Sequence, residues 1–347
     1  MSIPTQARQY TLPKLDGIHN LAIREASVPQ PKSGQILVKV HAVSLNFRDL
    51  LIVKGNYGLP VPKDVIPTSD MAGEIVALGE DVNPSVWKIG DRVAANFTQD
   101  HIDGDLTPEV QMTALGGQID GCLTEYKNFP AYSLVKIPEH LSYEEGATLP
   151  CAALTAWNAL NGPKPLKGGD YVLIQGTGGV SIFALQFAVA CGAVVIATSS
   201  SDAKLEIAKK LGARHLINYK TTPEWEKEVL RITNGRGVDH IIEVGGPGTL
   251  EKSVDSVRMA GWVHVIGFLA GQGDVNNVPL KTLFRAAMIR GIMIGSRKQF
   301  EEMNRLIEAQ QIKPLVDKVF GFEEAESAYK YLESQKHVGK VVIKVAQ

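Results

Sequence analysis

Residues 171–294 alternate between short strand-like and helix-like segments, and this alternation restricts the possible fold more than any other feature of the chain. Several of the strand-like segments lack polar residues at alternate positions, as do strands that helices cover on both faces. The pattern predicts a doubly wound parallel sheet of six strands, an α/β fold. The predicted strands are Tyr171–Gln175, Val194–Thr198, His215–Asn218, Asp239–Glu243, Trp262–Ile266 and Met288–Ile294. The predicted helices are Gly179–Cys191, Asp202–Leu211, Glu224–Thr233 and Thr249–Val257.

The segments on either side differ from this region. Residues 1–150 contain strand-like runs separated by Gly, Pro and Asp, with no dominant helical segment before Glu144, which is typical of a barrel or sandwich. The last predicted strand, Lys340–Val345, is apolar and needs a sheet to join, and we expect that sheet in the first domain. We therefore predict a β-rich domain at residues 1–152 and 295–347, interrupted by an α/β domain at residues 153–294. The other strands predicted in the β-rich domain are Gln35–Val43, Ala72–Ala77, Arg92–Ala95, Ser133–Ile137 and Leu315–Phe320, and its C-terminal helices are Phe300–Ala309 and Glu323–Leu332.

The charge balance bears on partners. The 347 residues contain 36 Lys and Arg against 37 Asp and Glu, which gives a net charge of -1. Proteins that bind nucleic acids or acidic membranes usually have a basic excess. The composition therefore favours a small-molecule substrate and argues against nucleic acid and membrane as partners.

Cysteines and terminal segments bear on the compartment. Three cysteines, Cys122, Cys151 and Cys191, are too few for a disulfide framework and suit a reducing compartment. The polar N-terminus does not resemble a signal peptide. Glycine interrupts the apolar stretch Val180–Ala197, which is interpreted as a buried helix followed by a buried strand. We expect a cytoplasmic protein.

A glycine-rich turn connects the first strand of the α/β region to its first helix. It contains Gly176, Gly178, Gly179 and Val180, and Ser181 stands in the place of the third glycine of a G-x-G-x-x-G pattern. Glycines allow a tight turn in which backbone N–H groups and a helix N-terminus face a pyrophosphate. At this strand-to-helix junction the motif predicts a dinucleotide site.

The end of the second strand predicts which dinucleotide binds. NAD-specific sites usually place an acidic residue there to hold the ribose 2′-hydroxyl. This sequence has Ser199 and Ser200, followed by Lys204, and these groups suit a 2′-phosphate. Three alternatives stay open, namely that Ser201 only caps a helix, that Lys204 is a solvated surface residue, and that Asp202 serves the ribose. We predict NADP(H) as cofactor.

Several motifs, in order, resemble those of the medium-chain dehydrogenase/reductase superfamily over nearly the whole chain. They are Val43-Ser44-Leu45-Asn46-Phe47-Arg48-Asp49, Ser69-Asp70-Met71-Ala72-Gly73-Glu74, Lys88-Ile89-Gly90-Asp91-Arg92-Val93, Leu149-Pro150-Cys151-Ala152-Ala153-Leu154-Thr155-Ala156-Trp157, the glycine turn, Lys210-Leu211-Gly212-Ala213 and Val338-Gly339-Lys340-Val341-Val342. The resemblance implies a GroES-like catalytic domain, an inserted Rossmann domain and an active cleft between them.

Zinc-dependent members of this superfamily bind catalytic zinc through Cys, His and Cys in three of these motifs. This chain has Asn46, Ser69 and Cys151 there, and Asn and Ser are poor zinc ligands. The four cysteines of the structural zinc lobe are also missing. We expect no metal, and we interpret Cys151 as a buried thiol. The acidic run within residues 96–118, with His101, Asp103 and Asp105, is interpreted as a solvated loop.

The segment Asn46-Phe47-Arg48-Asp49, together with the absence of the zinc ligands, resembles the zinc-independent quinone oxidoreductase branch. That resemblance implies that Asn46 and Tyr57 contact substrate, and it leaves Asp49 either catalytic or a brace for the local backbone. The cofactor residues that it implies are Thr155 at the carboxamide, Gly178, Gly179 and Val180 at the pyrophosphate, Ser200, Lys204 and Tyr219 at the 2′-phosphate, and Gly245, Gly267, Phe268 and Leu269 after the fourth and fifth strands.

Without a metal, hydrogen-bond donors must stabilise the charge that develops on a carbonyl oxygen. An Asn amide and a Tyr hydroxyl suit an electrophilic acceptor, so the sequence favours NADPH-dependent reduction of a quinone or an α,β-unsaturated carbonyl compound. A zinc-free alcohol or carbonyl reductase, a zinc alcohol dehydrogenase and a non-catalytic nucleotide-binding module are the alternatives. The apolar strand Met288–Ile294 is expected to extend the sheet across a homodimer.

Overall fold

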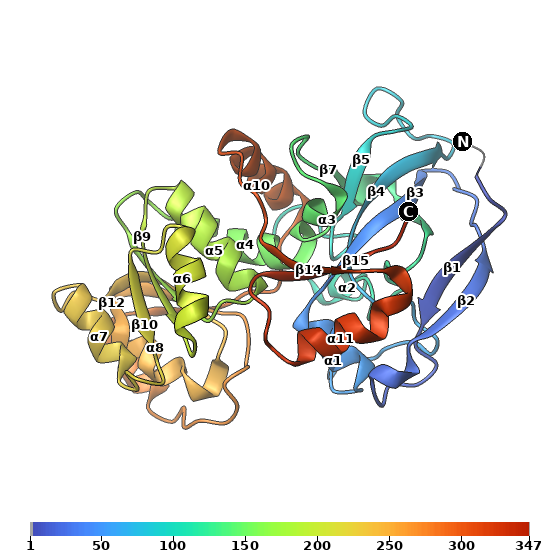
Figure 1. Cartoon of the computed structure of the whole chain (residues 1–347). Coiled ribbons are helices and arrows are strands. Elements are labelled where there is room, and N and C mark those ends of the chain that lie inside the picture. Colours follow the sequence, from blue (N-terminus) through green and yellow to red (C-terminus); the bar gives the residue numbers. More distant parts are fainter. Residues whose placement is uncertain (1–2, 347) are drawn as a thin grey trace. The chain divides into compact units, whose positions relative to one another are not determined.

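The computed structural model describes residues 3–346. The chain divides into two compact units (Figure 1). Unit 1 comprises Met1–Leu154 and Gly295–Gln347, and unit 2 comprises Thr155–Ile294. Unit 1 is thus built from two segments of sequence, and unit 2 lies between them along the chain.

Unit 2 contains a six-stranded sheet in which all pairings are parallel, in the order β10-β9-β8-β11-β12-β13. The order reverses between β8 and β11, as in a Rossmann fold. The central strands β8, β9 and β11 are buried on both faces, which explains the apolar runs Val172–Ile174 and Val194–Ala197 in the first two. The predicted doubly wound fold is therefore confirmed. The strands are β8 (Tyr171–Gln175), β9 (Val194–Ser199), β10 (His215–Asn218), β11 (Val238–Glu243), β12 (Val257–Val265) and β13 (Met288–Gly291).

Helices connect these strands, and the first of them is the most apolar. α5 carries Ile182, Phe183 and Leu185 on different sides, and all three are buried. A helix that is apolar on every side needs cover on every side. The helices of unit 2 are α5 (Gly179–Ala190), α6 (Asp202–Lys210), α7 (Trp225–Ile232), α8 (Leu250–Ser256) and α9 (Val278–Arg285), together with α4 (Leu154–Asn161), whose first residue belongs to unit 1.

Unit 1 is β-rich, and β3 (Gln35–Leu45) is its central strand. β3 pairs antiparallel with β4, β6 and the C-terminal strand β15. Among the described residues the sheet runs β14-β15-β3-β4-β5-β7, and β1 and β2 form a separate hairpin. The strands are β1 (Gln6–Thr11), β2 (Ala22–Ser27), β4 (Asp70–Leu78), β5 (Arg92–Ala95), β6 (Tyr126–Pro130), β7 (Leu134–Lys136), β14 (Val316–Phe320) and β15 (Lys340–Lys344).

Short helices cover this sheet. The sequence predicts no dominant helix before Glu144, yet α1 begins at Phe47. α1 has only seven residues, which is too short for a clear helical period. Helix α9 was not predicted either. The α-helices of unit 1 are α1 (Phe47–Val53), α2 (Pro108–Gln111), α3 (Tyr143–Gly146), α10 (Arg297–Ala309) and α11 (Ala325–Glu333), and a π-helix spans Leu149–Ala153.

The described residues, 3–346, include no helix of sufficient length and apolar character to cross a membrane. The apolar stretch Val180–Ala197 forms most of α5 and the beginning of β9. This agrees with its interpretation as a buried helix followed by a buried strand.

Candidate functional site

The carboxyl ends of the parallel strands place most of the predicted cofactor residues at one edge of the unit 2 sheet. Ligands of doubly wound folds bind at this edge, where the strand order reverses. Ser199 is the last residue of β9. The residues that follow the strands there are Gly176, Gly178, Gly179 and Val180 after β8, Ser200 after β9, Tyr219 after β10, Gly245 after β11, and Gly267, Phe268 and Leu269 after β12.

The glycine turn fits a phosphate group. Gly176 has a φ of 69°, a left-handed conformation that favours glycine. A Cβ atom built at Gly176 or Gly178 would meet no protein atom within 4 Å. Gly178 is also the N-cap of the 12-residue helix α5. Open space therefore lies beside a helix N-terminus with free backbone donors, the arrangement that holds a pyrophosphate.

A buried polar network behind this turn was not predicted. The Glu243 carboxylate is fully buried and accepts hydrogen bonds from the backbone N–H groups of Gly245 (2.8 Å) and Gly246 (2.9 Å). The Gln175 amide donates to Glu243 Oε2 (2.8 Å). Ser181 Oγ donates to the backbone oxygen of Gln175 (2.7 Å). The network thus fixes the loops after β8 and β11 relative to each other.

The loops after β11 and β12 are joined by backbone hydrogen bonds. Leu269 N donates to Val244 O (3.0 Å), and Ala270 N donates to Gly245 O (2.9 Å). Phe268 and Leu269 stay about half exposed. Gly245, Gly267, Phe268 and Leu269 therefore form one continuous wall at the carboxyl edge of the sheet.

The end of β9 carries serine hydroxyl groups, and a lysine follows in the next helix. Ser199 is buried, and its Oγ accepts a hydrogen bond from Ser201 N (3.3 Å). Lys204 lies in the first turn of α6. Asp202, which could serve a ribose instead, accepts a hydrogen bond from Asn218 Nδ2 (2.7 Å). The carboxylate is therefore engaged on the β10 side.

Tyr219 and Thr155 are two further residues predicted to contact the cofactor. Tyr219 follows β10 and is 41% exposed, and its backbone N–H donates to Ser199 O (3.1 Å). Thr155 is the first residue of unit 2 and is 2% exposed. Within residues 3–346 its Oγ1 atom has no hydrogen-bond partner. A buried hydroxyl of this kind needs a partner, and a carboxamide group can provide one.

In unit 1, Asn46 and Asp49 lie at the start of α1. Asn46 is its N-cap residue, and Asp49 Oδ2 accepts a hydrogen bond from the backbone N–H of Asn46 (2.8 Å). Both side chains are almost completely buried. Asp49 thus braces the backbone that carries Asn46, which is one of the two roles that the sequence leaves open for it.

The Asn46 side chain contacts Lys340, a residue from the other segment of unit 1. Lys340 Nζ donates to Asn46 Oδ1 (2.5 Å) and to the backbone oxygen of Leu45 (2.7 Å). Lys340 Nζ also lies 3.7 Å from Asp70 Oδ2, and both side chains of this ion pair are buried. Asp70 in turn accepts hydrogen bonds from Ser69 Oγ (2.9 Å) and Ser44 Oγ (3.2 Å).

Burial raises the pKa of both carboxyl groups in this cluster. The pKa of Asp49 rises to about 7, although its bond from Asn46 N and the nearby Arg48 oppose the rise. Burial also raises the pKa of Asp70, and Lys340 and then the Asn46 amide oppose that rise. The cluster is therefore a poorly solvated polar site at the start of α1.

Tyr57 packs beside α1. The Arg48 guanidinium lies 4.7 Å from the ring centroid of Tyr57 and the same distance from that of Phe97. Its Nη1 also donates to Leu115 O (2.8 Å). The cation between two aromatic rings holds the Tyr57 side chain beside the helix that carries Asn46.

Cys151 and the loop that contains His101, Asp103 and Asp105 are the two places considered for metal binding, and they differ in burial. Cys151 is buried in the π-helix, and burial raises the pKa of its thiol, as expected for a core thiol. The loop with His101 is less solvated than predicted. Asp103 and Asp105 are exposed, but His101 is buried and its Nε2 lies 3.0 Å from Gly104 O. Among the described residues no three His, Cys, Asp or Glu side chains are grouped to hold a metal.

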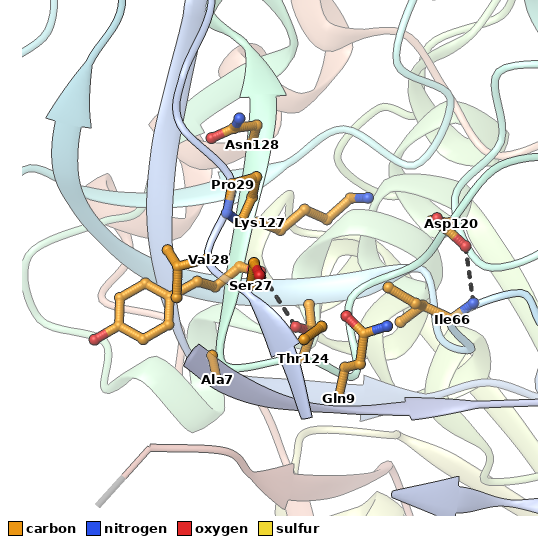
Figure 2. Close-up of a pocket in the computed structure, with 12 residues that line it drawn as sticks. Ala7, Gln9, Ser27, Val28, Pro29, Ile66, Asp120, Thr124, Lys127 and Asn128 are labelled. Carbon is orange, nitrogen blue, oxygen red and sulfur yellow. Dashed lines mark hydrogen bonds between the residues drawn. The ribbon is translucent and has the colours of Figure 1, made fainter. Parts of the chain in front are cut away.

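A separate cavity of about 320 Å³ lies beneath the β1–β2 hairpin (Figure 2). The Lys127 side chain extends along it, with its ammonium group on the side of Asp120 (Figure 2). Burial lowers the pKa of Lys127. None of the predicted site residues lines this cavity, so it is distinct from the candidate site.

Comparison with known proteins places the chain in a family. The model described as "Alcohol dehydrogenase GroES-like domain" matches residues 32–139, and the model described as "Zinc-binding dehydrogenase" matches residues 179–309. A zinc-type alcohol dehydrogenase-like protein of Schizosaccharomyces pombe is 50% identical over 96% of this chain and 97% of the relative. The chain belongs to the medium-chain dehydrogenase/reductase superfamily.

Two further similarities support this. A solved structure from Sinorhizobium meliloti 1021, named as a candidate alcohol dehydrogenase, is 36% identical, with a TM-score of 0.91 over 99% of this chain and 100% of the other. The human quinone oxidoreductase is 27% identical over 92% of each chain. The family prediction is confirmed, and this medium-chain dehydrogenase/reductase is an oxidoreductase whose Rossmann unit takes a pyridine nucleotide.

The name of one matching model raises the question of zinc, and the residues do not fit it. At the positions of the zinc ligands, Asn46 Oδ1 accepts from the Lys340 ammonium, and Ser69 Oγ donates to Asp70. Only Cys151 is a usual zinc ligand, and catalytic zinc needs about three from the protein. A buried ammonium group beside Asn46 would also repel a dication.

Proposed function

We propose that this protein reduces a quinone or an α,β-unsaturated or otherwise activated carbonyl compound with NADPH, without catalytic zinc. The observation that carries the proposal is the engagement of Asn46 by Lys340 (2.5 Å) at the position of a zinc ligand. An amide, rather than a metal ion, is thus available to polarise the acceptor.

NADPH is favoured over NADH by the groups at the end of β9. Ser199, Ser200 and Lys204 supply hydroxyl and ammonium donors, which bind a 2′-phosphate well. The carboxylate of Asp202, which could serve a ribose, accepts a hydrogen bond from Asn218. An acidic residue directed to the ribose would be required for NAD specificity.

The acceptor class follows from the strength of the donors. Neutral amide and phenol donors stabilise a developing oxyanion less than a metal ion does. An acceptor that is already electrophilic requires less stabilisation, as a quinone or an enone does. The name of the human quinone oxidoreductase, a relative of 27% identity, supports this class.

The proposed roles divide between the two units. In unit 2, the turn at Gly176–Val180 would hold the pyrophosphate and Thr155 the carboxamide, while Gly245, Gly267, Phe268 and Leu269 would line the nicotinamide half. The bound nicotinamide supplies a hydride, and the acceptor also takes up one proton. In unit 1, Asn46 would donate to the acceptor oxygen, Tyr57 would contact the acceptor or give the proton, and Asp49 would brace Asn46.

A second candidate is a zinc-free alcohol or carbonyl reductase. The name of the Schizosaccharomyces pombe relative, a zinc-type alcohol dehydrogenase-like protein of 50% identity, favours it. This candidate shares every proposed cofactor contact and differs only in the acceptor.

One assay tests the proposal. Purified protein is assayed with NADPH or NADH on a quinone, an enone and a saturated ketone in parallel. A primary alcohol is assayed with the oxidised coenzyme. The zinc content of the same preparation is measured. We expect turnover of the quinone or enone with NADPH, at zinc far below one ion per chain. Faster turnover of the ketone or alcohol would favour the second candidate, and no turnover at all would leave a nucleotide-binding module.

We also propose a homodimer and a cytoplasmic location. β13 is an edge strand of its sheet, and apolar side chains of β13 and α9 are exposed, among them Leu283, Phe284 and Met288. Exposed apolar edges of this kind favour pairing with another chain. All three cysteines are free, which suits a reducing compartment.

A further inference from the structure

The contact between Lys340 and Asn46 determines which end of the Asn46 amide faces the lysine. An ammonium group has three N–H donors and no acceptor. The atom that lies 2.5 Å from Lys340 Nζ must therefore be the carbonyl oxygen Oδ1. The Nδ2 atom, with two N–H donors, is at the other end of the amide.

The Nδ2 end of Asn46 is buried and makes no direct hydrogen bond among residues 3–346. It lies close enough to the Asp70 carboxylate to lower the pKa of that group, which leaves at least one of its two N–H donors for a ligand. Asn46 itself is only 9% exposed. A buried donor without a partner costs about 1–3 kcal/mol, so such a group usually has a ligand, a water molecule or a functional reason. An amide held with a donor left for a ligand is suited to bind an oxygen atom of a substrate.

Asp70 keeps the ammonium group of Lys340 in place. The two charged groups lie 3.7 Å apart, and each is at least 97% buried. Ser44 and Ser69 donate to the same carboxylate, at 3.2 and 2.9 Å. A buried ion pair with additional hydrogen bonds is restricted to one geometry, because neither charge can be released without a large desolvation cost.

We infer that Lys340, held by Asp70, is a positioning residue that directs the Nδ2 donors of Asn46 toward the carbonyl oxygen of the acceptor. This inference rests on the proposed function. Negative charge that develops on that oxygen during reduction would meet a donor whose own oxygen end is bonded to a cation. A hydrogen bond from a polarised amide is stronger than one from an isolated amide.

The Lys340 ammonium group also explains why the residues around Asn46 do not fit a zinc ion. A cation is present in this cluster, but it is the ammonium group of Lys340, and it acts on the acceptor through the Asn46 amide. The charge is supplied by β15, in the C-terminal segment of unit 1, and the donor by the start of α1.

The test removes the charge pair and keeps the shape of its side chains. In the double variant Lys340→Met with Asp70→Asn, neither charge is left buried alone. We expect kcat with an enone to fall about 10- to 100-fold, less than the roughly 10²- to 10³-fold loss on removal of an oxyanion donor, because the Asn46 amide remains. KM for NADPH should stay within about twofold. Lys344→Met is the matched control, because Lys344 is exposed on the same strand, and it should keep the wild-type kinetics.

A double-mutant cycle separates positioning from a general structural effect. If Lys340 acts through Asn46, removing the charge pair in an Asn46→Ala background should cause little further loss. The loss should also be larger for an enone than for a quinone, because the more electrophilic acceptor depends less on the donor. A structural defect would lower both activities equally.

Three results would overturn the inference. The first is a wild-type kcat in the charge-pair variant. The second is a triple variant whose loss equals the product of the losses in the charge-pair variant and in Asn46→Ala. The third is an equal loss for the enone and the quinone in the charge-pair variant. If the charge-pair variant does not fold, Asn46→Asp replaces the donor end by an acceptor at the same size, and its full activity would also overturn the inference. A wild-type protein without activity would contradict the proposed function itself. An active wild type whose charge-pair variant keeps full activity would contradict only the role of Lys340.

Discussion

His240 Nδ1 and His264 Nε2 lie 3.1 Å apart on the neighbouring parallel strands β11 and β12. Their rings are stacked, with centroids 5.4 Å apart, and both side chains are buried. Burial lowers the pKa of both imidazoles, and with the neighbouring His240 it lowers that of His264 to about 3. In the folded protein the pair is therefore neutral, with one ring donating its N–H to the other.

Acid should destabilise unit 2 through this pair. The folded pKa of His264 lies below its ordinary value of 6.5, so the unfolded chain binds more protons below about pH 6.5 and stability falls from there toward pH 3. We expect His264→Gln to reduce the slope of unfolding free energy by up to about 1.4 kcal/mol per pH unit in this window. Urea unfolding at several pH values measures it. His19→Gln, at an exposed histidine, should leave the slope unchanged, and an unchanged slope in His264→Gln would contradict the prediction.

Gly178→Ala should weaken nucleotide binding without unfolding the protein. The added Cβ meets no protein atom within 4 Å, and the φ of Gly178 is -75°, which alanine accepts. Stability should change by no more than about 1 kcal/mol, because the lower entropy of the unfolded chain offsets the loss of a glycine N-cap. The methyl group would occupy the space proposed for the pyrophosphate. We expect the Kd of NADPH to rise at least about tenfold, as measured by calorimetry.

Gly291→Ala is the matched control, because a Cβ there also meets no protein atom within 4 Å. It lies at the end of β13, away from the glycine turn in the sheet order. Equal nucleotide affinity in both variants would show that the open space beside Gly178 is not a phosphate site.

The coenzyme preference should depend on Ser200 and Lys204. Replacing both by alanine removes a hydroxyl and an ammonium donor from the proposed 2′-phosphate site, so we expect NADPH to bind about tenfold more weakly and NADH to bind unchanged. The ratio of the two dissociation constants is the measurement. Lys210→Ala, at an exposed lysine on the same helix, serves as control. Equal weakening of NADH would argue for a general structural effect.

The Rossmann fold could be predicted because local sequence patterns specify it. The strand Tyr171–Gln175 was predicted with the bounds that the structure shows, and β10 likewise. Parallel pairing then brings the carboxyl ends of the strands to one edge without further information. The residues predicted at that edge needed only their position after a strand.

The contacts of Lys340 could not be predicted in this way. Lys340 and Asn46 are 294 positions apart, and no periodicity or motif spacing relates them. The pairing of β15 with β3 brings them together. The Gln175–Glu243 network was missed for the same reason, because each residue alone looks like the polar end of a strand. Helix α1 was missed because its seven residues span about two turns.

Asp49 should make stability depend on pH between about 4 and 7. Its folded pKa of about 7 lies above the ordinary 3.8, so its contribution is complete below about pH 4 and is lost as the pH rises toward 7. Asn at this position stays neutral. We expect Asp49→Asn to gain stability relative to wild type over this range, by up to about 4 kcal/mol. Asp105→Asn, at an exposed carboxylate, should show no such trend in parallel denaturation curves.

The exposed apolar surface of α9 and β13 should mediate self-association. Leu283 and Phe284 are each 71% exposed, and β13 has a free edge in the sheet of unit 2. Burying side chains of this size contributes about 1.5–3 kcal/mol each, and placing a charge in such an interface opposes association. We therefore expect the wild type to sediment as a dimer and Leu283→Lys with Phe284→Glu to sediment as a monomer. Ile89→Lys, which changes a 68% exposed residue of unit 1, should stay dimeric. A wild type that is monomeric at every concentration, or a double variant that remains dimeric, would contradict an interface at this edge.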